Sequence, residues 1–191
     1  MSGRPLRLGG FVTVILGVIL LVLGFTSGRG GDFDAEVSRL SGASGPVLVI
    51  ESIELTTTVR GGGETSVGTI DPPSGQAMWV QGFDRVRPGS VGTAVVAGHV
   101  VYDGEDDIFA RLPAVDVGQE VRLVAGDESL DFVVTRAEIV DKHALTEDDE
   151  VWGPNSSTRQ LVVVTCDDAL GYGSDGHRRA NYVVVAEAVT D

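Results

Sequence analysis

Three side chains in this 191-residue chain could together carry out covalent chemistry at a carbonyl group. Cys166 is the only cysteine, His99 could exchange a proton with its thiol, and Arg179 could stabilise negative charge on an oxygen atom. Each also has a simpler interpretation: an inert buried cysteine, a solvated or hydrogen-bonded histidine, and an arginine paired with nearby aspartates. Their places in the chain must decide between these interpretations.

All three residues stand where an expected β-strand meets a loop. Cys166 ends the run 160–166, in which three valines follow a leucine, and β-branched residues favour strands. His99 likewise ends the apolar run 93–98, and Arg179 stands directly before the valine-rich run 181–189. Functional residues are often held in this way, at the ends of rigid elements.

The elements that would position these residues are mostly short strands bounded by Gly, Pro, Asp or Ser. Their number indicates an all-β domain, either a closed barrel or a sandwich, and the turn residues Gly126 and Asp127 indicate a hairpin. Helices are expected only in the connections 106–112 and 147–152. The expected strands span 47–55, 66–70, 77–83, 93–99, 120–125, 130–140, 160–166 and 181–189.

The N-terminal part of the chain predicts a membrane anchor. Residues 8–26 carry no charge and are long enough to cross a bilayer as one helix. Arg4 and Arg7 precede this segment and acidic residues follow it, which predicts a cytoplasmic N-terminus at 1–7 and a single pass through the plasma membrane. A cleaved signal peptide is the alternative. Residues 27–45 resemble a flexible stalk, so the extracellular domain is expected at 46–191.

Composition restricts the classes of partner. The chain has 28 acidic and 14 basic residues, a formal net charge of -14, which argues against binding to nucleic acid. A single cysteine cannot form an internal disulfide, so an exported domain must be held together by its core.

The order of these features resembles the sortases, a family of cysteine transpeptidases. The family motif Thr-Leu-x-Thr-Cys is matched by Val162 to Cys166, which keeps the closing Thr-Cys and replaces the first Thr and the Leu by valines. The likeness covers roughly residues 46–189 and is nearest to the actinobacterial class F sortases, in which the arginine stands two residues before an Asn. That spacing selects Arg179 over Arg178. Further similar stretches are Met78-Trp79, the 88–93 lead-in to Val-Val-Ala-Gly-His, 109–112, 117–121 and 179–181.

The resemblance implies a closed eight-stranded sortase β-barrel that cleaves a Leu-Pro-x-Thr-Gly-like sorting signal between Thr and Gly. Cys166 would be the nucleophile that forms a thioacyl-enzyme, His99 the acid and base, and Arg179 the stabiliser of the oxyanion. An amine acceptor, such as a cell wall precursor or a pilin subunit, would then receive the protein. Thr165 would contact the substrate or support the cysteine from behind, and His177 could line the substrate groove.

No metal or other cofactor is expected. The acidic runs 103–107 and 147–150 could gather calcium, but neither has the spacing of an EF-hand loop, and a solvated face is the favoured interpretation. No set of Cys, His and carboxylate residues has zinc spacing.

Two other functions are compatible with parts of the pattern. A cysteine peptidase could use the same pair to hydrolyse a similar signal, although papain-like enzymes place the cysteine before the histidine and on a helix. The domain could also be a non-catalytic extracytoplasmic β-barrel that only binds a partner.

Overall fold

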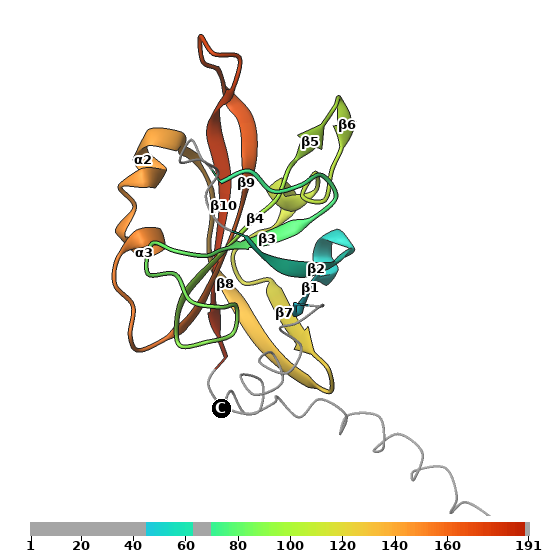
Figure 1. The fold of residues 1–191 in the computed structure, drawn as a ribbon, viewed down its shortest axis with the longest axis vertical. Coiled ribbons are helices and arrows are strands. Elements are labelled where there is room, and N and C mark those ends of the chain that lie inside the picture. The colour runs from blue at the N-terminus through green and yellow to red at the C-terminus, as the bar shows by residue number, and fades with distance from the viewer. Residues whose placement is uncertain (1–44, 63–69, 190–191) are drawn as a thin grey trace, which may run out of the picture.

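A computed structural model describes residues 45–62 and 70–189 of the chain. Eight strands close into a barrel in the order β1-β2-β3-β4-β9-β10-β8-β7, which confirms the expected barrel (Figure 1). The predicted anchor and most of the predicted stalk lie outside the described residues. Within the described ranges, no helix is long and apolar enough to cross a membrane.

The barrel strands are mostly antiparallel, but two pairs are parallel. These are β2 with β3 and β4 with β9. Cys166 lies in β9, and His99 follows the end of β4 by two residues. The strands span β1 Val47–Ile50, β2 Leu55–Gly62, β3 Ala77–Val80, β4 Gly92–Ala97, β7 Glu120–Ala125, β8 Glu128–Asp141, β9 Arg159–Tyr172 and β10 Arg178–Ala188.

The remaining elements are short. A separate two-stranded hairpin pairs β5 (Val101–Tyr102) with β6 (Glu105–Asp106). Two α-helices, α2 (Lys142–Thr146) and α3 (Asp149–Trp152), follow β8. Single 3₁₀ turns, η1 (Glu51–Ile53) and η2 (Leu112–Ala114), complete the described part. Figure 1 shows the β5-β6 hairpin and the long β9-β10 hairpin projecting at the same end of the barrel.

Several expected boundaries need correction. The expected strand 47–55 is divided, because Glu54 adopts a left-handed backbone (φ 55°) after η1, and β2 then begins at Leu55. The expected helix at 106–112 is replaced by β6, turns and η2. The expected strand 130–140 lies wholly within β8, and α2 follows it where a loop was expected. Most of the expected strand 66–70 lies outside the described residues, and Ile70 is not in a strand.

Two apolar cores lie on opposite faces of the sheet. Alternate residues of each strand point into the barrel, as Leu161 and Val163 of β9 do, while Val162 packs in a second cluster outside it. The outer cluster contains Leu145 and Val151, which come from α2 and α3. The two short helices therefore cover the outer face of β9 and β10.

Polar contacts hold these helices in place. Asp141 and Asp148 cap α2 and α3. The Asp141 carboxylate accepts hydrogen bonds from the backbone N–H groups of His143 and Ala144, and that of Asp148 accepts one from Glu150. Arg136 of β8 pairs with Asp148 at 2.7 Å, and this and further carboxylate bonds outweigh the burial of the guanidinium and raise its pKa. Arg85 donates to the carbonyl oxygens of Trp152 and Gly153, at 3.0 and 3.1 Å, at the end of α3.

Candidate active site

Cys166 lies on the outer face of β9, beyond the helices that cover that face. Side chains alternate along a strand, so Cys166 follows Val162 and Val164 on the side of the outer cluster. Its thiol is half-buried and unpaired with another cysteine. The strand thus delivers the sulfur to the surface of the barrel wall rather than to its interior.

His99 is brought to Cys166 by the parallel pairing of β4 with β9. The two strands are paired from Gly92 opposite Arg159 to Ala97 opposite Val164, and the Gly98 N–H continues the pairing to the carbonyl of Val164 at 3.3 Å. Two residues further along each chain stand His99 and Cys166. The same offset gives the two residues corresponding positions just beyond this pairing, and both line one open cavity of about 920 Å³.

Thr165 occupies a different place from the one expected for a substrate contact. It is 2% exposed, and its hydroxyl donates to the carbonyl oxygen of Gly98 at 2.8 Å. As the neighbour of Cys166 it faces the opposite side of the strand. This geometry favours the second expected role, support of the cysteine from behind, because the hydroxyl ties β9 to the chain just after β4.

Arg179 reaches the cavity from the start of β10. Asn181 pairs with Cys166, and its side-chain amide donates to the carbonyl oxygen of Thr165 at 3.0 Å. Arg179 precedes Asn181 by two residues, at a point where the pairing of β10 with β9 shifts register, and it lines the same cavity as Cys166.

Arg178 lies against an aromatic ring of β9. Its guanidinium lies 5.9 Å from the ring centroid of Tyr172, although it too borders the cavity. Within the described residues, neither arginine forms an ion pair with Asp167, Asp168 or Asp175, which was the simpler interpretation of the arginine pair. The side chain of Arg179 is exposed and available to a ligand.

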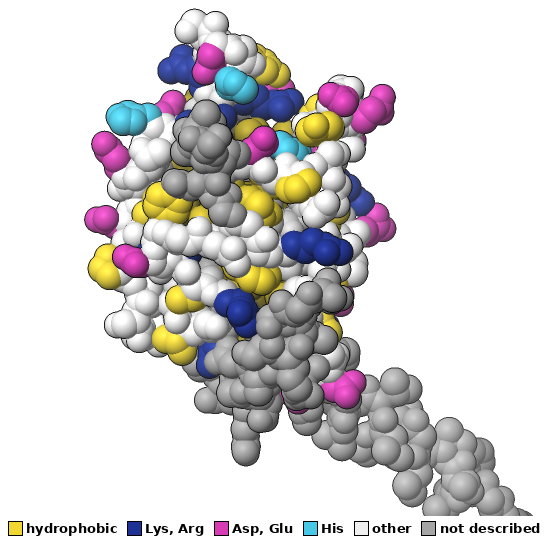
Figure 2. Space-filling model, in the orientation of Figure 1, with side chains coloured by type: hydrophobic (Ala, Val, Ile, Leu, Met, Phe, Trp, Pro, Cys, Tyr) yellow, Lys and Arg dark blue, Asp and Glu magenta, His cyan; other side chains and the backbone are white. Residues whose placement is uncertain are grey.

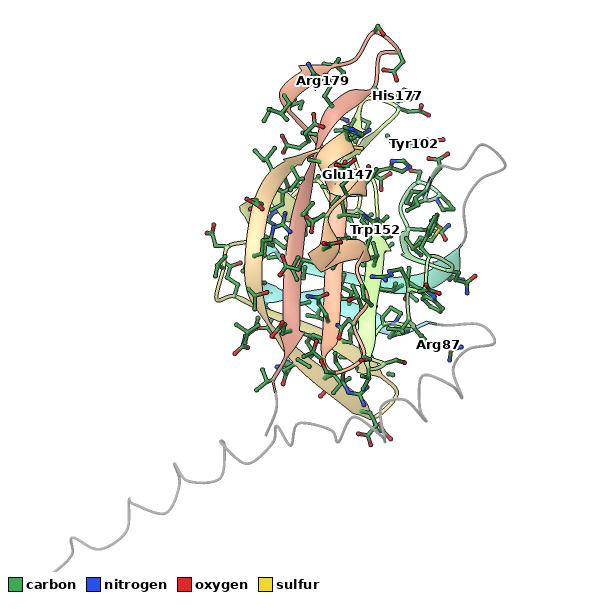
Figure 3. The ribbon with its side chains drawn as sticks, turned by 90° about the vertical axis from the view of Figure 1, so that its left-hand side faces the viewer. Arg87, Tyr102, Glu147, Trp152, His177 and Arg179 are labelled. Carbon is green, nitrogen blue, oxygen red and sulfur yellow. The ribbon has the colours of Figure 1, made fainter. Side chains whose placement is uncertain are left out.

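The rest of the cavity comes from the β9-β10 hairpin, the start of α2 and the segment after residue 69. His177, expected from the sequence to line a groove, lies on its rim, and Figure 3 shows it with Arg179 and Tyr102 at one end of the barrel. The histidine side chains visible in Figure 2 all lie toward this end. Asp175 accepts a hydrogen bond from the His177 backbone N–H at 3.0 Å, which lowers the pKa of its carboxyl group.

Sequence reasoning missed several residues that touch the site. Lys142 and His143 line the cavity because α2 begins there. The imidazole Nε2 of His99 lies 2.7 Å from the carbonyl oxygen of Pro72 and 3.6 Å from a carboxylate oxygen of Asp71. The ring of Tyr102 lies 5.4 Å from that of His99. No sequence signal identified Pro72, since it acts through its backbone from 27 residues away.

The assembled groups are those of covalent acyl transfer. A thiol can attack a carbonyl carbon, an adjacent imidazole can carry the proton, and a guanidinium can stabilise the oxygen that becomes negative. Within the described ranges, no three His, Cys, Asp or Glu side chains are grouped to hold a metal ion. Asp107, from the acidic run 103–107, instead accepts hydrogen bonds from Ser74, Gly75 and Ile108.

Comparisons with known proteins agree on one family. Residues 48–189, more than half of the chain, match the family model described as the sortase domain. A search of curated proteins found no match. Sortase C-1 from Actinomyces oris is similar in structure, with a TM-score of 0.58, 17% identity, and 84% of this chain and 82% of that chain covered. Sortase A from Listeria monocytogenes has a TM-score of 0.56 at 17% identity, covering 78% and 88% respectively. At these identities the structural likeness establishes the fold alone.

Proposed function

The chain belongs to the sortase family of cysteine transpeptidases, and we propose that it cleaves exported proteins at a Leu-Pro-x-Thr-Gly-like sorting signal and joins them to an amine. The observation that carries the proposal is the parallel pairing of β4 with β9. The pairing runs toward His99 and Cys166, and the proposal is further supported by the open cavity that both residues and Arg179 line. The actinobacterial class F subclass remains part of the proposal and rests on the position of Arg179 before Asn181.

In the first half-reaction, the thiolate of Cys166 attacks the Thr carbonyl carbon of the signal. The carbonyl oxygen becomes negative, and the exposed guanidinium of Arg179 donates hydrogen bonds to it. When the tetrahedral intermediate collapses, the Thr–Gly C–N bond breaks and His99 donates a proton to the leaving amine. The product is a thioester between the Thr carbonyl and Cys166.

In the second half-reaction, an acceptor amine attacks the thioester carbonyl. His99 takes the proton of the attacking amine, the C–S bond breaks, and the thiolate of Cys166 is restored. His177 borders the same cavity and contacts the bound peptide or the acceptor.

The substrates meet the enzyme at the outer face of the plasma membrane. Residues 8–26 anchor the chain with residues 1–7 inside, and the catalytic domain is extracellular. Substrate and enzyme tethered to one membrane have a high effective concentration. The acceptor is a peptide amine of a cell wall precursor or a lysine amine of a pilin subunit.

Product analysis tests this function. A library of sorting-signal peptides is incubated with the full-length enzyme and with a cell wall peptide amine, a pilin-derived lysine peptide or water alone. Mass spectrometry should find cleavage between Thr and Gly and a new amide to one of the amines, and neither product with Cys166→Ala. A free acid as the only product in every mixture would indicate a peptidase instead.

A further inference from the structure

The side chain of His99 contacts the segment that precedes β3. Its Nε2 lies 2.7 Å from the carbonyl oxygen of Pro72, with a carboxylate oxygen of Asp71 at 3.6 Å. A carbonyl oxygen only accepts hydrogen bonds, so Nε2 carries the hydrogen in this contact. The other ring nitrogen, Nδ1, is then the one free to exchange a proton with the thiol or the substrate.

The segment that supplies Pro72 has its own anchor. Residues 73–76 form a tight turn in which the Gln76 N–H donates to the carbonyl oxygen of Pro73 at 3.2 Å and Gly75 has a φ of +70°. This turn requires glycine at its third position. At the turn, the carboxylate of Asp107 accepts hydrogen bonds from the hydroxyl of Ser74 at 2.9 Å and from the Gly75 N–H at 2.8 Å.

Asp107 belongs to a segment, 107–109, that also forms hydrogen bonds to the main chain at His99 and Val100. The Phe109 N–H donates to the carbonyl oxygen of His99 at 2.9 Å, and the Asp107 N–H donates to that of Val100 at 3.1 Å. The Ile108 N–H bonds back to the Asp107 carboxylate at 2.5 Å. The segment 107–109 therefore forms hydrogen bonds both to the backbone of His99 and to the turn that follows Pro72.

The Asp107 carboxylate is suited to this position. Burial acts to raise its pKa, but the hydrogen bonds from Ile108, Ser74 and Gly75 outweigh that effect and lower it. The group is thus an anion at neutral pH and accepts several bonds at once.

We propose that Asp107 is a positioning residue for His99: by clamping the turn at Ser74 and Gly75, it holds the Pro72 carbonyl against Nε2 and aims Nδ1 at the reacting groups. This rests on the proposed function insofar as the imidazole transfers protons. Asp107 would then be the third group of the site, after the nucleophile Cys166 and the base His99, and its role would be to orient the base. The opposite possibility is that the Pro72 contact inhibits His99, in which case releasing the turn would speed the reaction.

The test combines kinetics with a signal from the imidazole itself. Asp107→Ala removes the whole clamp, Asp107→Asn keeps an acceptor oxygen, and Ser74→Ala removes a single bond. Asp106→Ala, an exposed neighbour with the same loss of charge, is the matched control. The full-length protein is labelled with ¹⁵N-histidine, and the His99 Nε2–H proton resonance is assigned by its absence in His99→Gln.

We expect Asp107→Ala to lower kcat about tenfold with KM changed less than about twofold, since a loosened base weakens general acid and base catalysis without removing a substrate contact. Ser74→Ala should lower kcat less, and Asp107→Asn should recover part of the loss. The Nε2–H resonance should broaden by exchange with water in Asp107→Ala and stay sharp in Asp106→Ala.

Contrary results are equally clear. A faster Asp107→Ala enzyme would make the turn inhibitory, and an unchanged kcat and resonance in both Asp107→Ala and Ser74→Ala would overturn the positioning role. If Asp107→Ala unfolds, the Ser74→Ala and Asp107→Asn variants decide the question. If the wild-type protein transfers no peptide but the resonance responds as expected, the proposed function fails and the clamp stands.

Discussion

Arg178 and Arg179 are adjacent in the chain and border one cavity, but their surroundings differ. The Arg179 side chain is exposed, whereas that of Arg178 lies against the ring of Tyr172. Arg179→Ala should therefore reduce the rate of acyl-enzyme formation about 10² to 10³-fold, the usual loss for one oxyanion donor. Arg178→Ala should reduce it less than about tenfold.

Stopped-flow or quenched-flow kinetics on the two variants provides the comparison, with folding checked by circular dichroism. The reverse order, a small loss for Arg179→Ala and a large loss for Arg178→Ala, would show that Arg178 is the functional arginine.

The shape of the guanidinium group leads to a second prediction for Arg179. Its planar fork can hold an oxyanion and a neighbouring substrate carbonyl together, whereas a lysine ammonium is a single charge on a flexible stem. Arg179→Lys should therefore remain within about tenfold of Arg179→Ala in the same assay. If Arg179→Lys keeps more than about half of the wild-type rate, the residue acts mainly as a counter-charge to nearby carboxylates, and the oxyanion role is lost.

At the scale of elements, the end of β4 must approach the segment after β6 very closely. A Cβ atom added at Gly98 would lie 2.6 Å from the ring of Phe109, which is fully buried. Gly98→Ala should cost about 1 to 3 kcal/mol of stability by overpacking. Gly98→Ala should lower activity as well, because the Phe109 N–H also donates a hydrogen bond to the His99 carbonyl oxygen.

Chemical denaturation and kinetics of Gly98→Ala, Phe109→Leu and the double variant measure this effect. The smaller side chain at 109 should relieve the clash, so the double variant should be more stable than the sum of the two single changes implies. Strictly additive losses would show that Gly98 and Phe109 do not conflict.

The elements also explain how far the site could be predicted from sequence. Valine-rich runs marked Cys166 and His99, because β-branched runs are a strong local signal. The expected end of the strand at Cys166 was wrong, since β9 continues to Tyr172. The burial of Thr165 could also have been predicted from the sequence, because neighbouring residues in a strand face opposite sides of the sheet. By contrast, β2 was missed because its threonine and glycine residues alternate weakly, and Pro72 and Asp107 were missed because turn-to-loop contacts leave no periodic pattern.

At the scale of the whole molecule, the proposed anchor places the two ends of the chain on opposite sides of the membrane. Single-cysteine variants in a Cys166→Ala background test this with a membrane-impermeant maleimide on intact cells. Val189→Cys, at a position that is 52% exposed, should be labelled, while Ser2→Cys should be labelled only after permeabilisation. Labelling of Ser2→Cys in intact cells would contradict the topology, and a shortened chain that lacks Ser2→Cys would indicate signal cleavage.

The central claim is that this barrel uses Cys166 to take an acyl group from a sorting signal, and the intact mass of the enzyme tests it most directly. Full-length protein is mixed with a Leu-Pro-x-Thr-Gly peptide without an acceptor, quenched in acid and weighed. The account predicts an increase equal to the peptide fragment ending in Thr, located on Cys166, absent in Cys166→Ala and released when an amine is added. No adduct with any library peptide, or an equal adduct in Cys166→Ala, would contradict it.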